Sequence, residues 1–141
     1  LSLPPSQGGL TNGAIHRLIA AGWEIDAHTI NHLDLTTLDA AGLRHEIAGS
    51  RQIIRRRFGV QVNWFCYPAG RYDSTVEAEV KEAGYAGATT TQPGWASPQE
   101  DPYRLPRVRV NGDTQPAALL GEITADHGAP WPGASFTGTG E

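Results

Sequence analysis

A short pattern of helix, glycine and apolar strand occurs three times in this chain, and it constrains the fold more than any other feature of the sequence. In each unit, apolar residues at helical spacing lead to a glycine (Gly22, Gly59 or Gly84), and a short apolar run follows. Glycine commonly ends helices, and alternating helices and strands are typical of parallel α/β folds. Because the predicted strands are short and bounded by loops, we expect a barrel-like sheet rather than a long open one.

Candidate capping residues indicate where the helices begin. Thr11 is placed to cap the first helix, and either Asp73 or Ser74 opens the third. Thr36 is followed three residues later by Asp39, a spacing that resembles an N-terminal capping box with aspartate in place of glutamate. We therefore expect the second helix to begin near Thr36.

Four parallel strands are expected, and their ends locate the site. The strands cover residues 23–27, 62–67, 85–90 and 105–110, and a short helix over residues 114–123 follows them. In parallel α/β folds, catalytic groups lie on the loops after the carboxyl ends of strands. The loops at residues 28–35 and 67–73 follow the first two strands and are rich in polar residues. We expect these two loops to meet at one rim of the sheet.

Length and composition set further limits. A (β/α) barrel usually needs about 250 residues, so the 141 residues of this chain predict a partial barrel, over residues 1–123. The chain contains no methionine and starts with Leu1, which favours a processed or partial chain. Residues 124–141 are rich in glycine, proline and threonine, and we expect a flexible tail there.

Charge and hydropathy argue against several classes of protein. Charged residues make up 18% of the chain and the net charge is −4, so we do not expect the basic face of a nucleic-acid-binding protein. The sequence has no run of about 18 consecutive apolar residues, so no transmembrane segment is expected. Hydrophobic residues make up 39% of the chain, which is enough to form a packed core.

Two histidines in the first of these loops form a candidate metal site. His28 and His32 are four residues apart, and on a helical turn this spacing places two imidazoles on one face, where they can share a metal ion. Catalytic zinc normally takes three protein ligands and a water molecule. Asp26 and Asp34 are nearby candidates for the third ligand, and a residue upstream of Leu1 is the alternative.

The second loop and the last strand supply candidates for substrate contacts. A turn of the kind formed by residues 67–70 can hold a backbone N–H toward a developing oxyanion, and one such donor contributes about 3 kcal/mol of transition-state stabilisation. Tyr72 and Trp95 either stack on a sugar face or pack in the core. Arginines also alternate along the last strand, at positions 104, 107 and 109. Most arginines in such positions are solvated or form ion pairs, but one of these three can orient a carboxylate by a bidentate contact.

Four segments, in order, resemble the polysaccharide deacetylases (carbohydrate esterase family four, with the NodB homology domain). Residues 22–36 resemble the second family motif, His-Ser/Thr-x-x-His, and residues 65–73 resemble the third. Residues 83–91 and 105–110 continue the match, so the likeness covers about residues 10–112. The resemblance implies an α/β fold that is the C-terminal portion of a distorted (β/α)7 barrel.

The resemblance also implies a hydrolase that removes N-acetyl groups from an amino-sugar polymer of the poly-N-acetylglucosamine, chitin or peptidoglycan type. A divalent metal, most often zinc, would be held by His28, His32 and an aspartate. The Thr29 hydroxyl would brace the loop, and the backbone N–H of Ala69 would form the oxyanion hole. A second aspartate would act as the general base and a histidine as the general acid. The expected substrate contacts are Tyr67, Pro68, Gly70, Tyr72 and Arg107.

The sequence departs from the family pattern in three places. The first motif, Thr-Phe-Asp-Asp, which supplies the base and the third ligand, is absent and would lie upstream of Leu1. Cys66 replaces the arginine that often begins the third motif, and the apolar run ending in histidine has no convincing counterpart, since His127 lies in the tail. The poly-N-acetylglucosamine deacetylases also lack that arginine and carry their acid histidine near the N-terminus, so the likeness is closest to that type.

These departures lead to two expectations. The chain by itself is expected to be inactive or nearly so, because the base, the acid and one ligand are missing. By resemblance, the protein is secreted or belongs to the cell envelope, although the chain contains no signal peptide. The alternatives are a non-catalytic carbohydrate-binding or structural remnant of the same fold, and a different metal amidase on the same scaffold.

Overall fold

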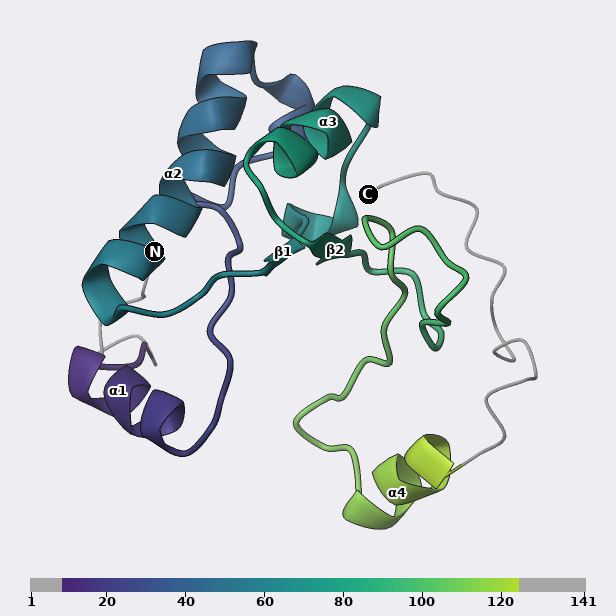
Figure 1. The fold of residues 1–141 in the computed structure, drawn as a ribbon. Helices are drawn as coiled ribbons and strands as arrows, with labels where there is room; N and C mark the ends of the chain where they lie inside the picture. Colours follow the sequence, from purple (N-terminus) through teal and green to yellow (C-terminus); the bar gives the residue numbers. More distant parts are fainter. Residues whose placement is uncertain (1–8, 125–141) are drawn as a thin grey trace.

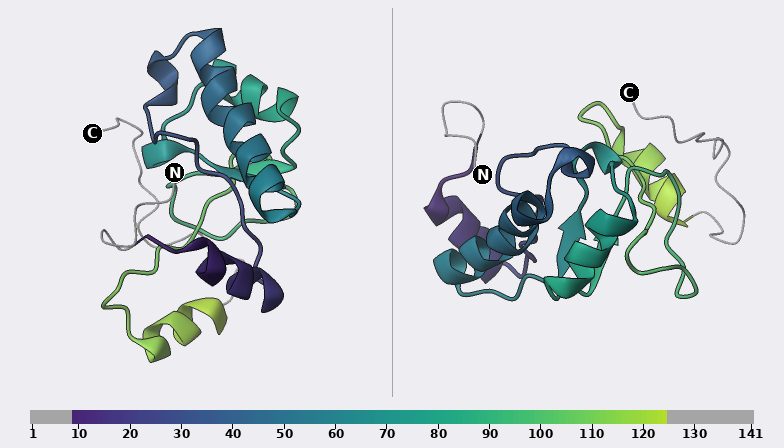
Figure 2. Two further views of the ribbon diagram at one scale, coloured as in Figure 1. Left: turned by 90° about the vertical axis from the view of Figure 1, so that its left-hand side faces the viewer. Right: turned by 90° about the horizontal axis from the view of Figure 1, so that it is seen from above.

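A parallel pair of short strands lies at the centre of the computed structural model, which describes residues 9–124 (Figure 1). The elements are α1 (Asn12–Ala20), a 3-10 turn (Leu35–Thr37), α2 (Ala40–Phe58), β1 (Trp64–Cys66), a second 3-10 turn (Pro68–Gly70), α3 (Ser74–Glu82), β2 (Gly87–Thr89) and α4 (Pro116–Thr124). Helices α2 and α3 pack together over one face of the strands, and α1 and α4 lie on the other side (Figures 1 and 2). The described chain is therefore a mixed α/β fold.

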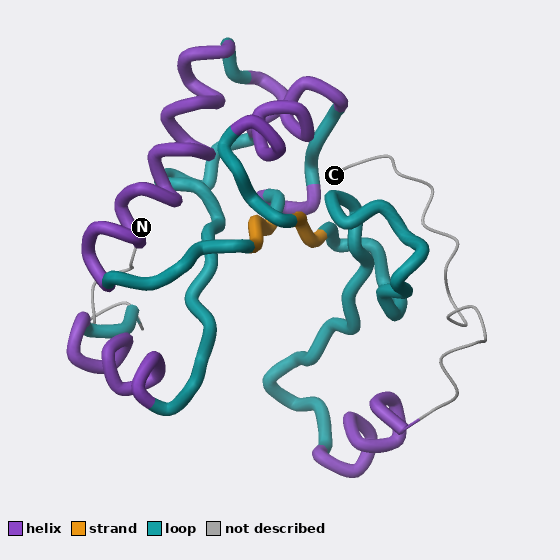
Figure 3. Tube along the Cα trace, viewed as in Figure 1, coloured by secondary structure: helices purple, strands orange, loops and turns teal. Residues whose placement is uncertain are grey.

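The four predicted strand segments are present in the expected order and direction, but they are shorter than predicted. In β1 and β2, Phe65 pairs with Ala88. Outside these strands, Ala27 forms an isolated parallel bridge with Phe65, and Leu105 forms one with Thr89. Loops make up most of the backbone around the two strands (Figure 3). The predictions of full strands over residues 23–27 and 105–110 are therefore wrong.

Each shortened segment has a local cause. Next to Ala27, the Asp26 carboxylate accepts hydrogen bonds from the backbone N–H groups of Asn63 and Trp64, at 3.0 and 2.9 Å. The Asp26 side chain therefore accepts two N–H groups that would otherwise donate to backbone carbonyl groups of a neighbouring strand. After Leu105 comes Pro106, which has no N–H to continue a ladder.

The helix starts follow the predicted caps, with one exception. The Thr11 hydroxyl accepts from Ala14 N at 3.1 Å, and the Asp73 carboxylate caps α3. Helix α2 does not begin at Thr36. It begins at Ala40, because Asp39 itself is the cap and accepts from Gly42 N at 2.8 Å. The preceding residues form a separate 3-10 turn.

The core lies between the two packed helices and the strands. Its buried side chains include Ile47 of α2, Phe65 of β1, Val76 and Val80 of α3, and Tyr67, which directly follows β1. The Phe65 ring lies 5.6 Å from the Tyr67 ring and 5.2 Å from the Tyr85 ring, between centroids. Burial of each such side chain contributes about 1.5–3 kcal/mol. This packing fixes the end of β1, from which the second candidate loop emerges.

The far end of the chain is described in part. The predicted helix over residues 114–123 is confirmed as α4. The expected tail at residues 124–141 lies, apart from Thr124, outside the described residues. Between residues 9 and 124, none of the helices has both the length and the apolar character that crossing a membrane requires.

Candidate functional site

The imidazoles of His28 and His32 lie together in the loop that follows Ala27. Their ring centroids are 4.8 Å apart and their planes are inclined by 72°. A tetrahedral zinc ion with Zn–N bonds of about 2.0–2.1 Å places two ligating imidazoles about 5 Å apart between centroids. Both residues are exposed. The spacing and the accessibility of the two rings therefore fit a shared metal ion.

The two rings meet through a bend and not through the predicted helical turn. Thr29 and His32 have φ angles of 64° and 57°, in the left-handed region that non-glycine residues rarely adopt. The buried Thr29 hydroxyl accepts the His32 N–H at 2.9 Å, which confirms the expected bracing of the loop. The backbone reversal between the two histidines, rather than helical periodicity, brings their side chains to one place.

The end of β1 orients the His28 ring. His28 Nδ1 lies 2.7 Å from the Cys66 carbonyl oxygen, so Nδ1 carries the proton and donates, and Nε2 keeps its lone pair. Metal-ligating histidines commonly anchor their second nitrogen on a carbonyl in this way. The hydrogen bond with the Cys66 side chain raises the pKa of His28, against the effect of burial. Burial raises the pKa of the Cys66 thiol, but hydrogen bonds with His28 and Thr89 bring it below its ordinary value.

A buried carboxylate beneath this loop was missed in the sequence. Glu46 of α2 is 2% exposed, and its Oε2 accepts the backbone N–H groups of Ile30 and Asn31 at 2.9 and 2.8 Å. Its Oε1 accepts from Asn31 Nδ2 at 2.6 Å. Glu46 lies beside Leu43 and Ile47 on the apolar face of its helix, and this polar residue among apolar ones was the available signal.

Neither nearby aspartate joins the histidine pair. Asp26 is engaged by the backbone N–H groups at the start of β1, and burial raises its pKa. Asp34 Oδ2 forms an ion pair with Arg71 at 2.8 Å, while its Oδ1 accepts from the Thr36 side chain. Within residues 9–124, no three potential ligands of the His, Cys, Asp and Glu types come together. Among the described residues, two potential metal ligands therefore come together and not three.

The turn after β1 presents one free backbone donor. Ala69 has φ 51° and ψ 16°, and it is exposed. The N–H groups of Gly70 and Arg71 are bonded to the carbonyls of Tyr67 and Pro68, at 2.9 and 3.0 Å. Among the described residues, the Ala69 N–H has no such acceptor. The ion pair between Asp34 and Arg71 joins this turn to the histidine loop.

Two of the predicted substrate contacts are core residues. Tyr67 and Pro68 are buried, and the Tyr67 hydroxyl donates to the Tyr103 carbonyl at 3.0 Å. Substrate contact by Tyr67 and Pro68 stays a prediction, and in this structure both residues serve the packing of the core. Tyr72 is partly buried and stacks on Tyr67, with centroids 4.5 Å apart and planes at 15°. Of the two expected roles of Tyr72, the structure thus shows packing against a core residue.

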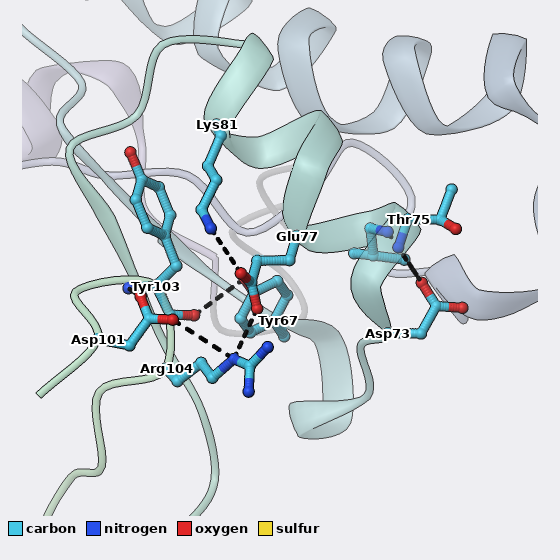
Figure 4. A network of polar contacts seen from close by, with 9 residues as sticks. Tyr67, Asp73, Thr75, Glu77, Lys81, Asp101, Tyr103 and Arg104 are labelled. Carbon is cyan, nitrogen blue, oxygen red and sulfur yellow. Dashed lines mark hydrogen bonds and ion pairs between the residues drawn. The ribbon is translucent and has the colours of Figure 1, made fainter.

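The arginines near the site have different surroundings. Arg104 donates to the buried Glu77 at 2.7 Å, and Lys81 donates to the other Glu77 oxygen at 2.6 Å (Figure 4). The hydrogen bond with Lys81 is the main reason why the pKa of Glu77 is lowered. Arg107 is exposed, and its charge acts on both His28 and Cys66. The positive charge of Arg107 lowers the pKa of both groups.

Comparison with known proteins assigns this arrangement to a family. The family model described as polysaccharide deacetylase matches residues 9–88, which is more than half of the chain. The chain belongs to the polysaccharide deacetylase family. The matched residues include both histidines, the Glu46 carboxylate and the turn at Ala69, whereas Arg107 lies beyond them.

Two solved deacetylases and one curated relative support the assignment. YxkH of Bacillus subtilis, assigned as a polysaccharide deacetylase, is 34% identical over 102 residues, which are 72% of this chain and 37% of YxkH. The deacetylase PplD of Streptococcus pyogenes matches with a TM-score of 0.73 and 26% identity, over 79% of this chain and 50% of PplD. A polysaccharide deacetylase of Bacillus cereus matches with a TM-score of 0.72 and 27% identity, over 82% of this chain and 37% of its own. This polysaccharide deacetylase chain thus spans about a third of the length of its curated relatives.

Proposed function

We propose that this segment carries part of the active site of a metal-dependent deacetylase that hydrolyses N-acetyl groups of an amino-sugar polymer. The observation that carries the proposal is the pair of exposed imidazoles, 4.8 Å apart, with His28 Nδ1 anchored on the Cys66 carbonyl. Family membership supports the same reaction class. The S. pyogenes relative was solved in complex with acetate, the product that such a reaction releases.

In this proposal, His28 and His32 hold a divalent metal, zinc in the first instance. When bound, zinc polarises a carbonyl group and lowers the pKa of a water molecule. The Ala69 N–H donates to the carbonyl oxygen as it gains negative charge, which stabilises the transition state by about 3 kcal/mol. Arg107, Gly70 and Tyr72 contact the polymer. The third ligand, the base and the acid come from residues outside the described range.

The wider assignment follows from the same resemblance. We place residues 1–123 in the C-terminal portion of a distorted (β/α)7 barrel, in which the four parallel segments are consecutive strands. The cysteine at position 66 favours the poly-N-acetylglucosamine type of deacetylase. Because such a polymer lies outside the cell, we also propose that the protein acts there or in the cell envelope.

The test is acetate release from acetylated chito-oligomers by the whole natural protein that contains this segment. His28→Ala and His32→Ala are expected to reduce kcat/KM by at least about 100-fold, as loss of a catalytic group does. A chelator should have the same effect, and added zinc should reverse it. His45→Ala is the matched control, because His45 is exposed on α2 and, among residues 9–124, its ring is not one of those in contact with His28 or His32. Activity that is indifferent to the chelator and to His28→Ala contradicts the proposal.

A second candidate is a non-catalytic carbohydrate-binding module of the same fold. It is favoured by one observation: the described residues bring together two potential metal ligands and not three. Under this alternative, the whole protein binds acetylated oligomers without turnover. Its affinity for them, measured by calorimetry, is then the same with His28→Ala as with the unaltered protein.

A further inference from the structure

We infer that Glu46 is the positioning residue of the histidine site, because its buried carboxylate holds the loop that brings His28 and His32 together. The inference rests on the proposed function and adds to it a role for a residue that is not itself a metal ligand. Glu46 reaches the loop from α2, fourteen residues beyond His32 along the chain. All three of its donors lie between the two histidines.

Glu46 meets the histidine loop as a carboxylate anion that is bound by N–H groups of the loop. A buried carboxylate is costly unless donors surround it, and Glu46 forms none of the ion pairs found among residues 9–124. Its donors are the N–H groups of Ile30 and Asn31 and the Asn31 side chain. Burial raises the pKa of Glu46, but these hydrogen bonds outweigh burial and keep the pKa below its ordinary value. The carboxylate is therefore ionised at neutral pH.

The loop needs such a support because its backbone is strained at two points. Thr29 and His32, on either side of the Glu46 donors, have φ angles of 64° and 57°. Glu46 fixes the two peptide groups between these residues. A second contact supports the same loop, since the Ile30 side chain lies against the backbone of Gly49, where a Cβ would be 3.0 Å from Ile30 Cδ1. Helix α2 is thus the platform on which the bend is built.

Two substitutions of Glu46 distinguish the effect of its hydrogen-bond acceptors from the effect of its side-chain volume. In Glu46→Gln, the amide oxygen still accepts both backbone N–H groups, and the amide nitrogen faces Asn31 once the Asn31 side chain flips. In Glu46→Leu, the space is filled but every acceptor is lost. Glu77→Gln is the matched control, because it removes a buried carboxylate from α3 that makes no contact with the histidine loop.

The first readout is the zinc affinity of the whole natural protein that contains this segment, measured by competition with a chromophoric chelator. Glu46→Leu is expected to weaken zinc binding by about 10–100-fold, the usual effect of losing a residue that orients a ligand. Glu46→Gln is expected to weaken it by about threefold, because charged acceptors bind more strongly than neutral ones. Glu77→Gln should leave it unchanged. If Glu46→Leu binds zinc as the unaltered protein does, the inference is wrong; if that variant does not fold, an unchanged affinity in Glu46→Gln overturns it.

The second readout needs no metal and separates this inference from the proposed function. Proton NMR of the metal-free whole protein reports the contact between the His28 and His32 rings, which Glu46→Leu should abolish and Glu77→Gln should preserve. If His28→Ala leaves zinc binding unchanged, the proposed function fails, while the ring contact still decides the role of Glu46. A ring contact that survives in folded Glu46→Leu overturns the inference even where zinc binding is confirmed.

Discussion

Thr29 combines three properties that are seldom found together in one side chain. It is 4% exposed, its backbone is left-handed, and its hydroxyl accepts the His32 N–H at 2.9 Å. A β-branched residue in this conformation is under strain, and a nearby hydrogen bond compensates for part of it. The hydroxyl therefore matters for the geometry of the site and not only for its polarity.

Thr29→Val tests this role, since valine keeps the shape and removes the acceptor. The His32 N–H loses its partner, and we expect the free energy of unfolding to fall by about 1 kcal/mol. Urea denaturation followed by circular dichroism measures the change. Thr29→Ser keeps the hydroxyl and should retain the hydrogen bond. If the valine variant is as stable as the unaltered chain, the hydroxyl does not support the loop.

At the same scale, the sequence located the two candidate ligands better than the residues that support them. His28 and His32 are recognisable because both lie in one short segment after a predicted strand. The partner of His28 is the Cys66 carbonyl, a backbone atom that leaves no signature in the sequence. Glu46 was detectable only as a polar residue on an apolar face, and its target, the bend, could not be foreseen from helical spacing.

The first residue of a helix depends on its N-cap, so the start of a helix is predicted correctly when the N-cap residue is identified correctly. For α2, Asp39 is the N-cap and Thr36 belongs to the preceding 3-10 turn. Asp39→Ala should therefore lower the free energy of unfolding by about 1 kcal/mol. Thr36→Ala should have a smaller effect, because its amide hydrogen bond to Asp34 remains. Thermal or urea denaturation of both variants compares the two, and a larger loss in Thr36→Ala contradicts the assignment of the cap.

Strands are harder to predict than helices because their length depends on partners elsewhere in the chain. The apolar runs correctly indicated four parallel segments, which the pairs at Ala27, Phe65, Ala88 and Leu105 bear out. Their lengths were overestimated, because the Asp26 side chain takes over two amide groups and Pro106 interrupts the last ladder. Whether these segments continue around a complete barrel is the part of the fold that stays a proposal.

At the scale of the described molecule, residues 9–124, a polar network is centred on Glu77 and includes neither histidine of the candidate site. Glu77 of α3 receives Lys81 from its own helix and Arg104 from the loop beyond β2, and Arg104 also pairs with Asp101 at 3.6 Å (Figure 4). The Tyr67 hydroxyl, at the start of the turn, donates to the backbone of the same loop. The network thus ties α3 and the candidate oxyanion turn to one distant segment.

This network makes the stability of the chain depend on pH in a definite direction. The pKa of Glu77 is lowered by its hydrogen bonds with Lys81 and Arg104, against the effect of burial. A carboxylate whose pKa is depressed by folding contributes fully above its unfolded pKa, ordinarily 4.5, and loses that contribution as the pH falls through the lower folded value. The free energy of unfolding should therefore fall with acid over this range, and less steeply in Glu77→Gln.

Glu79→Gln is the matched control on the same helix. Burial raises the pKa of Glu79, with a smaller effect of Glu82, so Glu79 has the opposite linkage: protonation favours the folded form. Removing Glu79 should leave the loss of stability with acid as steep as before, or steeper. Urea titrations of the three proteins at a series of pH values from 7 downward measure the difference. Equal acid dependence in all three would show that another carboxylate, and not the Glu77 network, sets the acid limit of the fold.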